Sequence, residues 1–199
     1  MKIIGLTGGI ASGKSTVSAY LRQKGIPIID CDVEARHVFD VGQKAYYDVI
    51  AEFGEEILNE DKTIDRKKLA SIVYPDKEKV KRLNQINHPS VIARTYELLN
   101  EYRDAGNDIV VIDAPLLIEA GMNKMADEVW VVYTDIEVQI RRAMKRDNST
   151  YEAVINRMKN QASYEEKIKY ADKLINNNGT IEELYQQVDK LLAEVVDNV

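Results

Sequence analysis

An eight-residue string near the start of the chain restricts its fold more than any other feature. A short, mostly apolar run from Lys2 to Leu6 precedes it, and the string matches G-x-x-x-x-G-K-[ST]. This pattern is typical of a phosphate-binding loop between a strand and a helix. Glycines let the backbone fold around phosphate groups, and the helix N-terminus adds a positive field. The residues expected to bind nucleotide phosphates are Gly8, Gly9, Ile10, Ala11, Ser12, Gly13, Lys14, Ser15 and Thr16.

Three side chains in or near this loop have expected chemical roles. Lys14 can reach the β- and γ-phosphate oxygens, so we expect a catalytic role for it, and Ser15 can hold Mg²⁺. Asp113 ends a later apolar run, where such loops usually have a second metal-coordinating residue. A simple helix cap is the alternative for Asp113. ATP and Mg²⁺ are therefore the expected cofactors.

The remaining pattern predicts an α/β fold with a parallel sheet, because apolar runs without alternation suit strands that are covered on both faces. Helical spacing and caps predict helices between these runs, with capping boxes beginning at Ser149, Ser163 and Thr180. From residue 33 to 105 helical segments dominate, with breaks expected at Pro75 and at His88-Pro89. The predicted strands are residues 2–6, 27–30, 108–113, 128–133 and 173–175, and the predicted helices outside the middle region are 14–24, 136–147, 151–160 and 181–196.

Asp32 is the candidate general base. Asp30-Cys31-Asp32 lies at the end of the second predicted strand, and the carboxyl ends of strands line the ligand crevice of an open α/β sheet. One carboxylate there could orient and deprotonate an acceptor hydroxyl, while the other helps to position metal-bound water. The alternative is that Asp32 caps the following helix, a role that aspartate serves well.

Basic side chains gather on the helices predicted after residue 136. Arg142 and Arg146 lie one turn apart on the same face of one helix, and Arg157 follows on the next. Such arginines suit a mobile lid that closes over a transferring phosphoryl group, excludes water and stabilises developing charge. A solvated face paired with acidic neighbours is the alternative for each of them.

Several motifs together resemble the dephospho-coenzyme A kinase family over nearly the whole chain. Beyond the phosphate-binding loop, they separate this family from other P-loop kinases. They are Ile29-Asp30-Cys31-Asp32, Asn87-His88-Pro89, Asp113-Ala114-Pro115-Leu116-Leu117-Ile118-Glu119, Arg142-x-x-x-Arg146-Asp147, Gln161, and Ala171-Asp172-x-x-Ile175-x-Asn177-Asn178-Gly179. Cys31 is a departure, since the family more often has alanine between the two aspartates.

The resemblance implies a five-stranded P-loop NTPase core like that of nucleoside monophosphate kinases, with residues 1–32, 108–135 and 171–199. It also implies a helical acceptor-binding subdomain at 33–107 and a lid at 136–170. The implied reaction transfers the γ-phosphoryl group of ATP to the ribose 3′-hydroxyl of dephospho-coenzyme A. By motif, Asp32 falls on the family's base, Asn177 near the adenine, and Arg142 and Arg146 in the lid. The residues expected to face the acceptor are Asp32, Arg36, His88 and Leu116.

Other classes fit the sequence less well. A GTPase switch needs N-K-x-D after a strand, but in the nearest string the aspartate, Asp127, comes one residue too far along and precedes the strand. Another small-acceptor kinase, such as a nucleoside monophosphate kinase, remains the enzymatic alternative, and a non-enzymatic ATP-binding module would leave Asp32 and the lid arginines without a use.

Composition narrows the expected partners and location. The net charge of −6 argues against nucleic acid as a partner. One cysteine excludes an internal disulfide framework, and no apolar run is long enough for a membrane span. A cytoplasmic location is expected, with ATP and dephospho-coenzyme A as partners, and a monomer is the default expectation.

Overall fold

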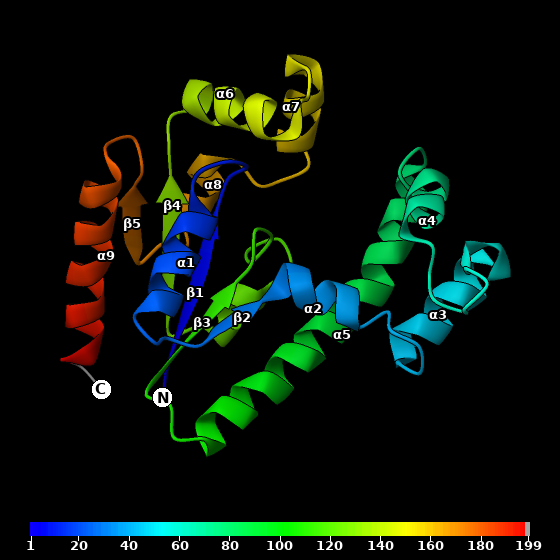
Figure 1. Ribbon diagram of the computed structural model, residues 1–199, viewed down its shortest axis with the longest axis horizontal. Helices are drawn as coiled ribbons and strands as arrows, with labels where there is room; N and C mark the ends of the chain where they lie inside the picture. Colours follow the sequence, from blue (N-terminus) through cyan, green and yellow to red (C-terminus); the bar gives the residue numbers. More distant parts are fainter. Residues whose placement is uncertain (198–199) are drawn as a thin grey trace. The chain divides into compact units, whose positions relative to one another are not determined.

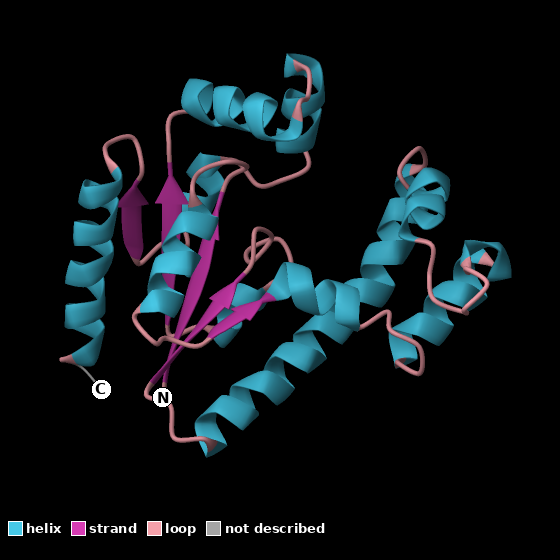
Figure 2. Ribbon diagram, viewed as in Figure 1, coloured by secondary structure: helices cyan, strands magenta, loops and turns pink. Residues whose placement is uncertain are grey.

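The computed structural model describes residues 1–197, which form two compact units. Unit 1 combines Met1–Ile29 with the part of the chain from Glu101 onward, and unit 2 is Asp30–Asn100. The chain passes from one unit to the other at the end of the second strand and again within a long helix. Each unit is described separately below (Figures 1 and 2).

The sheet has five strands in the order β2-β3-β1-β4-β5, which confirms the predicted five-stranded parallel sheet. β1 lies at the centre and pairs in parallel with β3 on one side and β4 on the other. The chain therefore leaves β1 toward one edge of the sheet and later crosses to the other side of it. Ligands in open α/β sheets bind beyond the carboxyl ends of the strands at such a reversal. The strands are β1 Lys2–Gly8, β2 Ile28–Asp30, β3 Ile109–Asp113, β4 Glu128–Tyr133 and β5 Lys173–Asn176.

Two helices cover one face of the sheet (Figure 1). α1 spans Lys14–Gln23, and α9 spans Ile181–Val196. α9 buries an apolar stripe at helical spacing, and this stripe packs with side chains of α1 and of the strands in a single core. The buried members of this core on β1, α1 and α9 are Ile4, Leu6, Val17, Leu21, Leu184, Val188, Leu192 and Val195.

The opposite face of β1 is approached closely by the turn that follows β3. A Cβ atom on Gly5 would come within 2.8 Å of a Leu117 methyl group, and Leu117 is fully buried. Glycine at this position therefore lets the turn pack directly on the central strand. The other elements of unit 1 are the 3₁₀ turn η2 Met122–Met125 and the helices α6 Ile136–Asp147, α7 Tyr151–Met158 and α8 Tyr164–Ile168.

Unit 2 is built almost entirely from helices, together with one isolated antiparallel bridge between Leu58 and Ile64. Its longest helix, α5, has 28 residues and continues into unit 1. In the described part of the chain, no helix is both long enough and apolar enough to cross a membrane. The elements are α2 Cys31–His37, α3 Lys44–Phe53, the 3₁₀ turn η1 Glu55–Ile57, α4 Arg66–Val73 and α5 Lys77–Asp104.

The break predicted at His88-Pro89 is wrong, because Pro89 lies inside α5. Proline lacks the N–H that would bond to the carbonyl four residues earlier, and its ring crowds that carbonyl. The Ser90 hydroxyl donates a hydrogen bond to the Ile86 carbonyl at 3.0 Å beside the proline. Val91, Thr95 and Leu99 then form a buried stripe at helical spacing. We infer that this burial offsets the cost of the proline.

The capping box predicted at Ser149 is also wrong, whereas those at Ser163 and Thr180 are confirmed. The backbone N–H of Ser149 donates to the Met144 carbonyl at 3.2 Å and so belongs to the end of α6. The N-cap of α7 is instead Thr150, whose hydroxyl accepts a bond from the Ala153 N–H. Because the N-cap is Thr150, the third residue of the helix is Ala153, which has no carboxylate to complete a capping box.

Replacing Thr180 by alanine should lower the free energy of unfolding by about 1 kcal/mol, the usual cost of losing an N-cap. The Thr180 hydroxyl accepts a bond from the Glu183 N–H at the start of α9, the helix whose buried stripe completes the core. Urea unfolding followed by circular dichroism measures the change. Thr180→Ser, which keeps the hydroxyl, should be close to the parent protein, and equal stability of all three would contradict the capping role.

Candidate active site

Residues 9–13 form a tight turn between β1 and α1. Ala11 and Gly13 have positive φ angles, 55° and 97°, and the Ser12 N–H donates to the Gly9 carbonyl at 3.1 Å. Gly13 is the N-cap of α1, and no side chain caps this helix. The turn therefore presents backbone N–H groups at a helix N-terminus, the arrangement that binds phosphate.

Glycine is required at two places in this turn because other side chains contact its backbone. A Cβ atom on Gly13 would lie 1.9 Å from the Asn177 amide nitrogen. A Cβ atom on Gly9 would lie 2.7 Å from Oε1 of Gln139. Asn177, which follows β5, and Gln139, which follows β4, thus enclose the turn. A larger residue at either glycine would push the turn away from these side chains.

The Ser12 carbonyl oxygen is the point at which the turn is held. Nδ2 of Asn177 donates to it at 2.8 Å, and Oγ1 of Thr134 donates to it at 3.0 Å. Both of these side chains are more than nine-tenths buried. The Arg142 guanidinium extends the network with 3.4 Å contacts to Thr134 Oγ1 and to the Asn177 carbonyl. The ends of β4 and β5 therefore set the shape of the phosphate-binding turn.

Lys14 forms an ion pair with Asp113, the last residue of β3. Asp113 is only 3% exposed, and its second oxygen accepts a hydrogen bond from Ser18 Oγ. The Lys14 side chain is 16% exposed. The carboxylate thus holds the lysine ammonium beside the turn, since β1 and β3 are neighbours in the sheet.

A cleft of about 350 Å³, called here the phosphate cleft, opens beside the turn. It brings together predicted residues from three separate parts of the sequence: the turn, α6, and the segment after β5. Its lining is polar and basic. The lining residues are Ala11, Gly13, Ser15, Thr16, Arg142, Arg146, Asn177, Gly179 and Ile181.

The two arginines of the phosphate cleft differ in their partners. Arg146 holds Asp147 through two hydrogen bonds of 2.7 and 2.9 Å, and Arg157 on α7 holds the same carboxylate at 2.6 Å. These cations hold the pKa of Asp147 well below its usual range, and Asp147 in turn raises the pKa of Arg146. Arg142, in contrast, contacts the neutral oxygens of Thr134 and Asn177.

In unit 2, the helix cap after β2 is Asp30 and not Asp32. Asp30 Oδ1 accepts bonds from the N–H groups of Asp32 and Val33 at 3.1 and 3.2 Å. Asp32 itself lies in the first turn of α2 and is exposed. The alternative that Asp32 is the N-cap is therefore excluded, while its role as a base remains a prediction.

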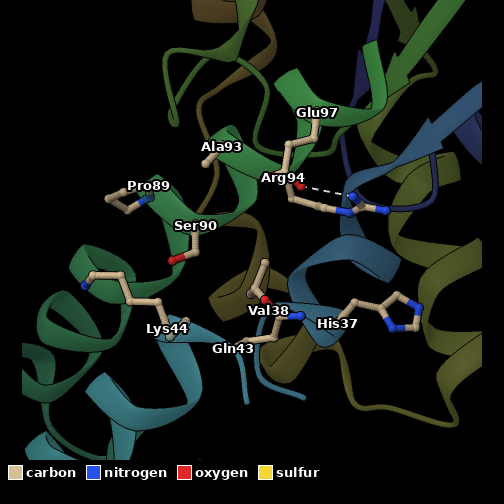
Figure 3. A pocket seen from close by; sticks show the side chains of 10 residues that line it. His37, Val38, Gln43, Lys44, Pro89, Ser90, Ala93, Arg94 and Glu97 are labelled. Atoms are coloured by element: carbon tan, nitrogen blue, oxygen red, sulfur yellow. Dashed lines mark hydrogen bonds and ion pairs between the residues drawn. The ribbon is translucent and has the colours of Figure 1, made fainter. Parts of the chain in front are cut away.

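A groove of about 290 Å³ lies in unit 2 between α2, α3 and α5 (Figure 3). It is lined by the neighbours in sequence of two predicted acceptor residues, His37 beside Arg36 and Pro89 beside His88. Arg94 lines it too and forms ion pairs with Glu97 at 3.0 Å and Glu34 at 3.4 Å. The sequence does contain a signal for this groove, because the lining residues of α5 recur at helical spacing and so share one face of the helix. They are Pro89, Ser90, Ala93, Arg94 and Glu97.

Sequence reasoning also missed a larger cleft in unit 1 and the ion pair beside it. The cleft has a volume of about 690 Å³ and is lined by residues of the turn, β4, α6, α7 and α8. Next to it, Lys167 is 1% exposed and pairs with Glu119 at 3.0 Å. Glu119 and Gln161 stand in the motifs quoted above, but only the fold reveals that Glu119 pairs with the distant Lys167 and that Gln161 lines this cleft. Leu116 lies in the half-buried turn after β3.

Oxygen ligands for a metal ion are available at the turn. The Ser15 hydroxyl lines the phosphate cleft, and the Asp113 carboxylate lies beside Lys14. Among residues 1–197, no three His, Cys, Asp or Glu side chains cluster as a complete metal site. This donor set fits Mg²⁺, which usually keeps several waters and binds through one or two protein oxygens together with substrate phosphates.

The fold and the turn define the class to which the chain belongs, the P-loop kinases. The Acinetobacter baumannii shikimate kinase has a similar fold, with a TM-score of 0.56 at 16% identity over 94% of that chain and 100% of this one. The family model described as Dephospho-CoA kinase matches residues 2–183. The chain therefore belongs to the dephospho-CoA kinase family.

Individual relatives agree with this family over their whole length. A dephospho-CoA kinase from Carboxydothermus hydrogenoformans is 45% identical over 98% of this chain and 94% of that protein. One from Listeria monocytogenes is 42% identical over 99% of this chain and 98% of that protein. The solved dephospho-CoA kinase from Campylobacter jejuni has a TM-score of 0.76 at 30% identity, covering 100% of this chain and 99% of that one. These matches favour this family over nucleoside monophosphate kinases.

His88 should be neutral at pH 7, because its partial burial lowers its pKa from 6.5. The unfolded chain then binds more protons than the folded one at pH values between the lowered pKa and 6.5. The resulting stability is complete above pH 6.5 and is lost as the pH falls through the folded pKa. NMR titration of the His88 ring should give a midpoint below 6.5. His88→Gln should reduce the loss of stability on acidification, and a midpoint at or above 6.5 would contradict this.

Proposed function

We propose that this protein transfers the γ-phosphoryl group of ATP to the ribose 3′-hydroxyl of dephospho-coenzyme A, giving coenzyme A and ADP. One observation carries the proposal: a phosphate-binding turn that leads into Lys14 and borders a cleft lined by Arg142 and Arg146, in a chain of the dephospho-CoA kinase family. The geometry supports the donor side, and the family supports the acceptor. A monomeric state and a cytoplasmic location stay predictions.

The ATP phosphates bind, in this proposal, to the backbone of residues 8–16. The uncapped N-terminus of α1 and the N–H groups of the turn supply donors that need no rearrangement, which favours charge stabilisation in the transition state. Lys14 moves from Asp113 to the β- and γ-phosphate oxygens. Asn177 and its neighbours Gly179 and Ile181 form the side of the phosphate cleft at which the adenine of ATP would lie.

Mg²⁺ would be held by Ser15 and, directly or through water, by Asp113. Bound there, it would neutralise phosphate charge and orient the γ-phosphoryl group. When the Lys14 ammonium moves to the phosphates, Asp113 Oδ1 becomes available to hold Mg²⁺, while Ser18 still donates to the other carboxylate oxygen.

The lid arginines neutralise charge on the phosphoryl group. Arg142 can reorient at low cost, because its present contacts are long and involve neutral oxygens. Arg146 must share its charge with Asp147, and that carboxylate fixes its orientation through two hydrogen bonds. We therefore assign the closing movement to Arg142 and a more static role to Arg146.

The residues proposed to face the acceptor are Asp32, Arg36, His88 and Leu116. Asp32 orients the hydroxyl and accepts its proton as bonding to phosphorus develops. Arg36 supplies positive charge, whereas His88 is neutral at pH 7 and offers hydrogen bonds to the acceptor.

Lys14→Ala should lower kcat by about 10²–10³-fold, the scale for losing one preorganised donor to transition-state charge. Steady-state assays with saturating ATP and acceptor measure this. Lys24→Ala is the matched control, since Lys24 is a half-exposed lysine paired with Asp189 outside the cleft. Because Lys14 neutralises buried Asp113, a melting curve must show that the variant is folded at the assay temperature. Turnover close to that of the parent protein would reject the role of Lys14.

Asp32→Asn should lower kcat by about 10²–10⁴-fold, the range for a positioned base, with little change in ATP affinity. Asparagine keeps the size of the side chain but lacks the basic oxygen. Asp30→Asn is the matched control, because asparagine caps a helix about as well as aspartate and α2 should stay intact. Turnover of Asp32→Asn within about threefold of the parent protein would exclude Asp32 as the base. A large loss in Asp30→Asn alone would move the assignment to Asp30.

A further inference from the structure

The larger cleft of unit 1 lies against the same turn as the phosphate cleft but contacts different residues of it. We call it the α7–α8 cleft. Gly9 and Ile10 line the α7–α8 cleft, whereas Ala11 and Gly13 line the phosphate cleft. Its volume of about 690 Å³ falls within the range of small-molecule sites. A group bound there would thus be separated from the phosphates only by the turn.

Two tyrosines give this cleft an aromatic wall. Tyr133 ends β4 and Tyr164 begins α8, and their rings are stacked with centroids 5.1 Å apart and an interplanar angle of 30°. Both line the cleft together with apolar side chains. Burial raises the pKa of Tyr164, so its ring remains uncharged at neutral pH. Flat aromatic surfaces of this kind stack with nucleobases. The apolar side chains that complete the wall are Ile10, Val132, Ile136, Ile155 and Met158.

The charges around the cleft favour an uncharged occupant over a phosphate group. Asp135, Glu165 and Glu166 line it, and within residues 1–197 Lys159 is the one lysine of the lining without a carboxylate partner. The second lysine, Lys167, is neutralised by Glu119. The phosphate cleft, in contrast, has two arginines. An uncharged ring therefore fits the α7–α8 cleft, and a diphosphate does not.

Gln161 supplies a polar group suited to a base. It lines the cleft and is half-buried, and in the part of the chain that the structure describes its side-chain amide has no hydrogen-bond partner. A glutamine amide offers one donor and one acceptor side by side, which matches the adjacent amino group and ring nitrogen of adenine.

The wall that carries Gln161 and Tyr164 is held in place by hydrogen bonds to the turn after β3. Lys167 Nζ donates to Glu119 at 3.0 and 3.2 Å and to the Pro115 carbonyl at 3.0 Å. Glu119 Oε1 also accepts a bond from the Ala162 N–H at 2.7 Å. These bonds attach the segment before α8 to the turn after β3. This wall of the cleft is therefore fixed to the turn after β3.

We propose that the α7–α8 cleft binds the adenine of the acceptor, stacked on Tyr164 and hydrogen-bonded to Gln161. This inference rests on the proposed function. The reacting hydroxyl and the adenine of the acceptor are attached to the same ribose, so both must lie near the γ-phosphate. The adenine of ATP is separated from the γ-phosphate by the whole triphosphate and takes the side of the phosphate cleft at Asn177.

Tyr164→Ala should raise the KM for dephospho-coenzyme A by about tenfold, the scale for losing one aromatic side chain that stacks on a base. The KM for ATP should change by less than about twofold, because the donor's base lies elsewhere. Tyr164→Phe keeps the ring and should resemble the parent protein. Tyr170→Ala is the matched control, as Tyr170 is exposed and does not line the cleft. Gln161→Ala, on the same wall, should also raise the acceptor KM, and this change leaves the aromatic wall intact.

Each other outcome overturns the inference. If Tyr164→Ala and Gln161→Ala raise the KM for ATP instead, the cleft holds the donor's base. If the variants are folded and neither KM changes, the cleft holds no part of either substrate. If the parent protein does not phosphorylate dephospho-coenzyme A, the proposed function fails, and calorimetric titration with adenosine then tests the cleft separately. With a saturating non-hydrolysable ATP analogue present, adenosine should bind the parent protein and not Tyr164→Ala; equal binding to both would reject the cleft as a base site.

Discussion

The arrangement of the active site depends on the hydrogen bonds to one carbonyl oxygen, that of Ser12. Asn177 and Thr134 donate to it from the ends of two different strands, and both are buried where water cannot compete. A turn of glycines would otherwise sample many conformations at an entropic cost on binding. Because the sheet positions these two donors, side chains of the protein itself fix the shape of the turn, which is the physical basis of electrostatic preorganisation.

Two partly buried ion pairs connect the loops around this turn. Lys14 pairs with Asp113, and Lys167 pairs with Glu119, so the β3 strand and the turn after it supply both carboxylates. Buried ion pairs contribute little net stability, since desolvation offsets most of the attraction, but losing one partner is costly. Their value here is positional. The first holds the catalytic lysine at the turn, and the second holds the wall of the α7–α8 cleft.

The errors in the sequence predictions have local explanations. Pro89 was expected to end a helix, but the buried stripe of α5 on its C-terminal side continues through it. Ser149 was expected to cap α7, but its N–H is used to end α6, and the cap moves to Thr150. In both places, contacts with residues outside the motif outweigh the preference of the motif itself. The carboxylates of Asp30 and Asp32 are a related case, since spacing alone does not show that Asp30 makes the capping bonds.

The sequence by itself determined the strand order along the chain, the phosphate-binding turn, and the caps at Ser163 and Thr180, because these depend on residues close together in the chain. It also indicated that Asp113, Arg142, Arg146 and Asn177 matter, through motifs. Only the tertiary structure decided that Asn177 and Thr134 hold Ser12, that Lys14 pairs with Asp113, and that Tyr133 stacks with Tyr164. These partners lie far apart in the sequence, and their proximity follows from the packing of the parallel strands, which no local pattern records.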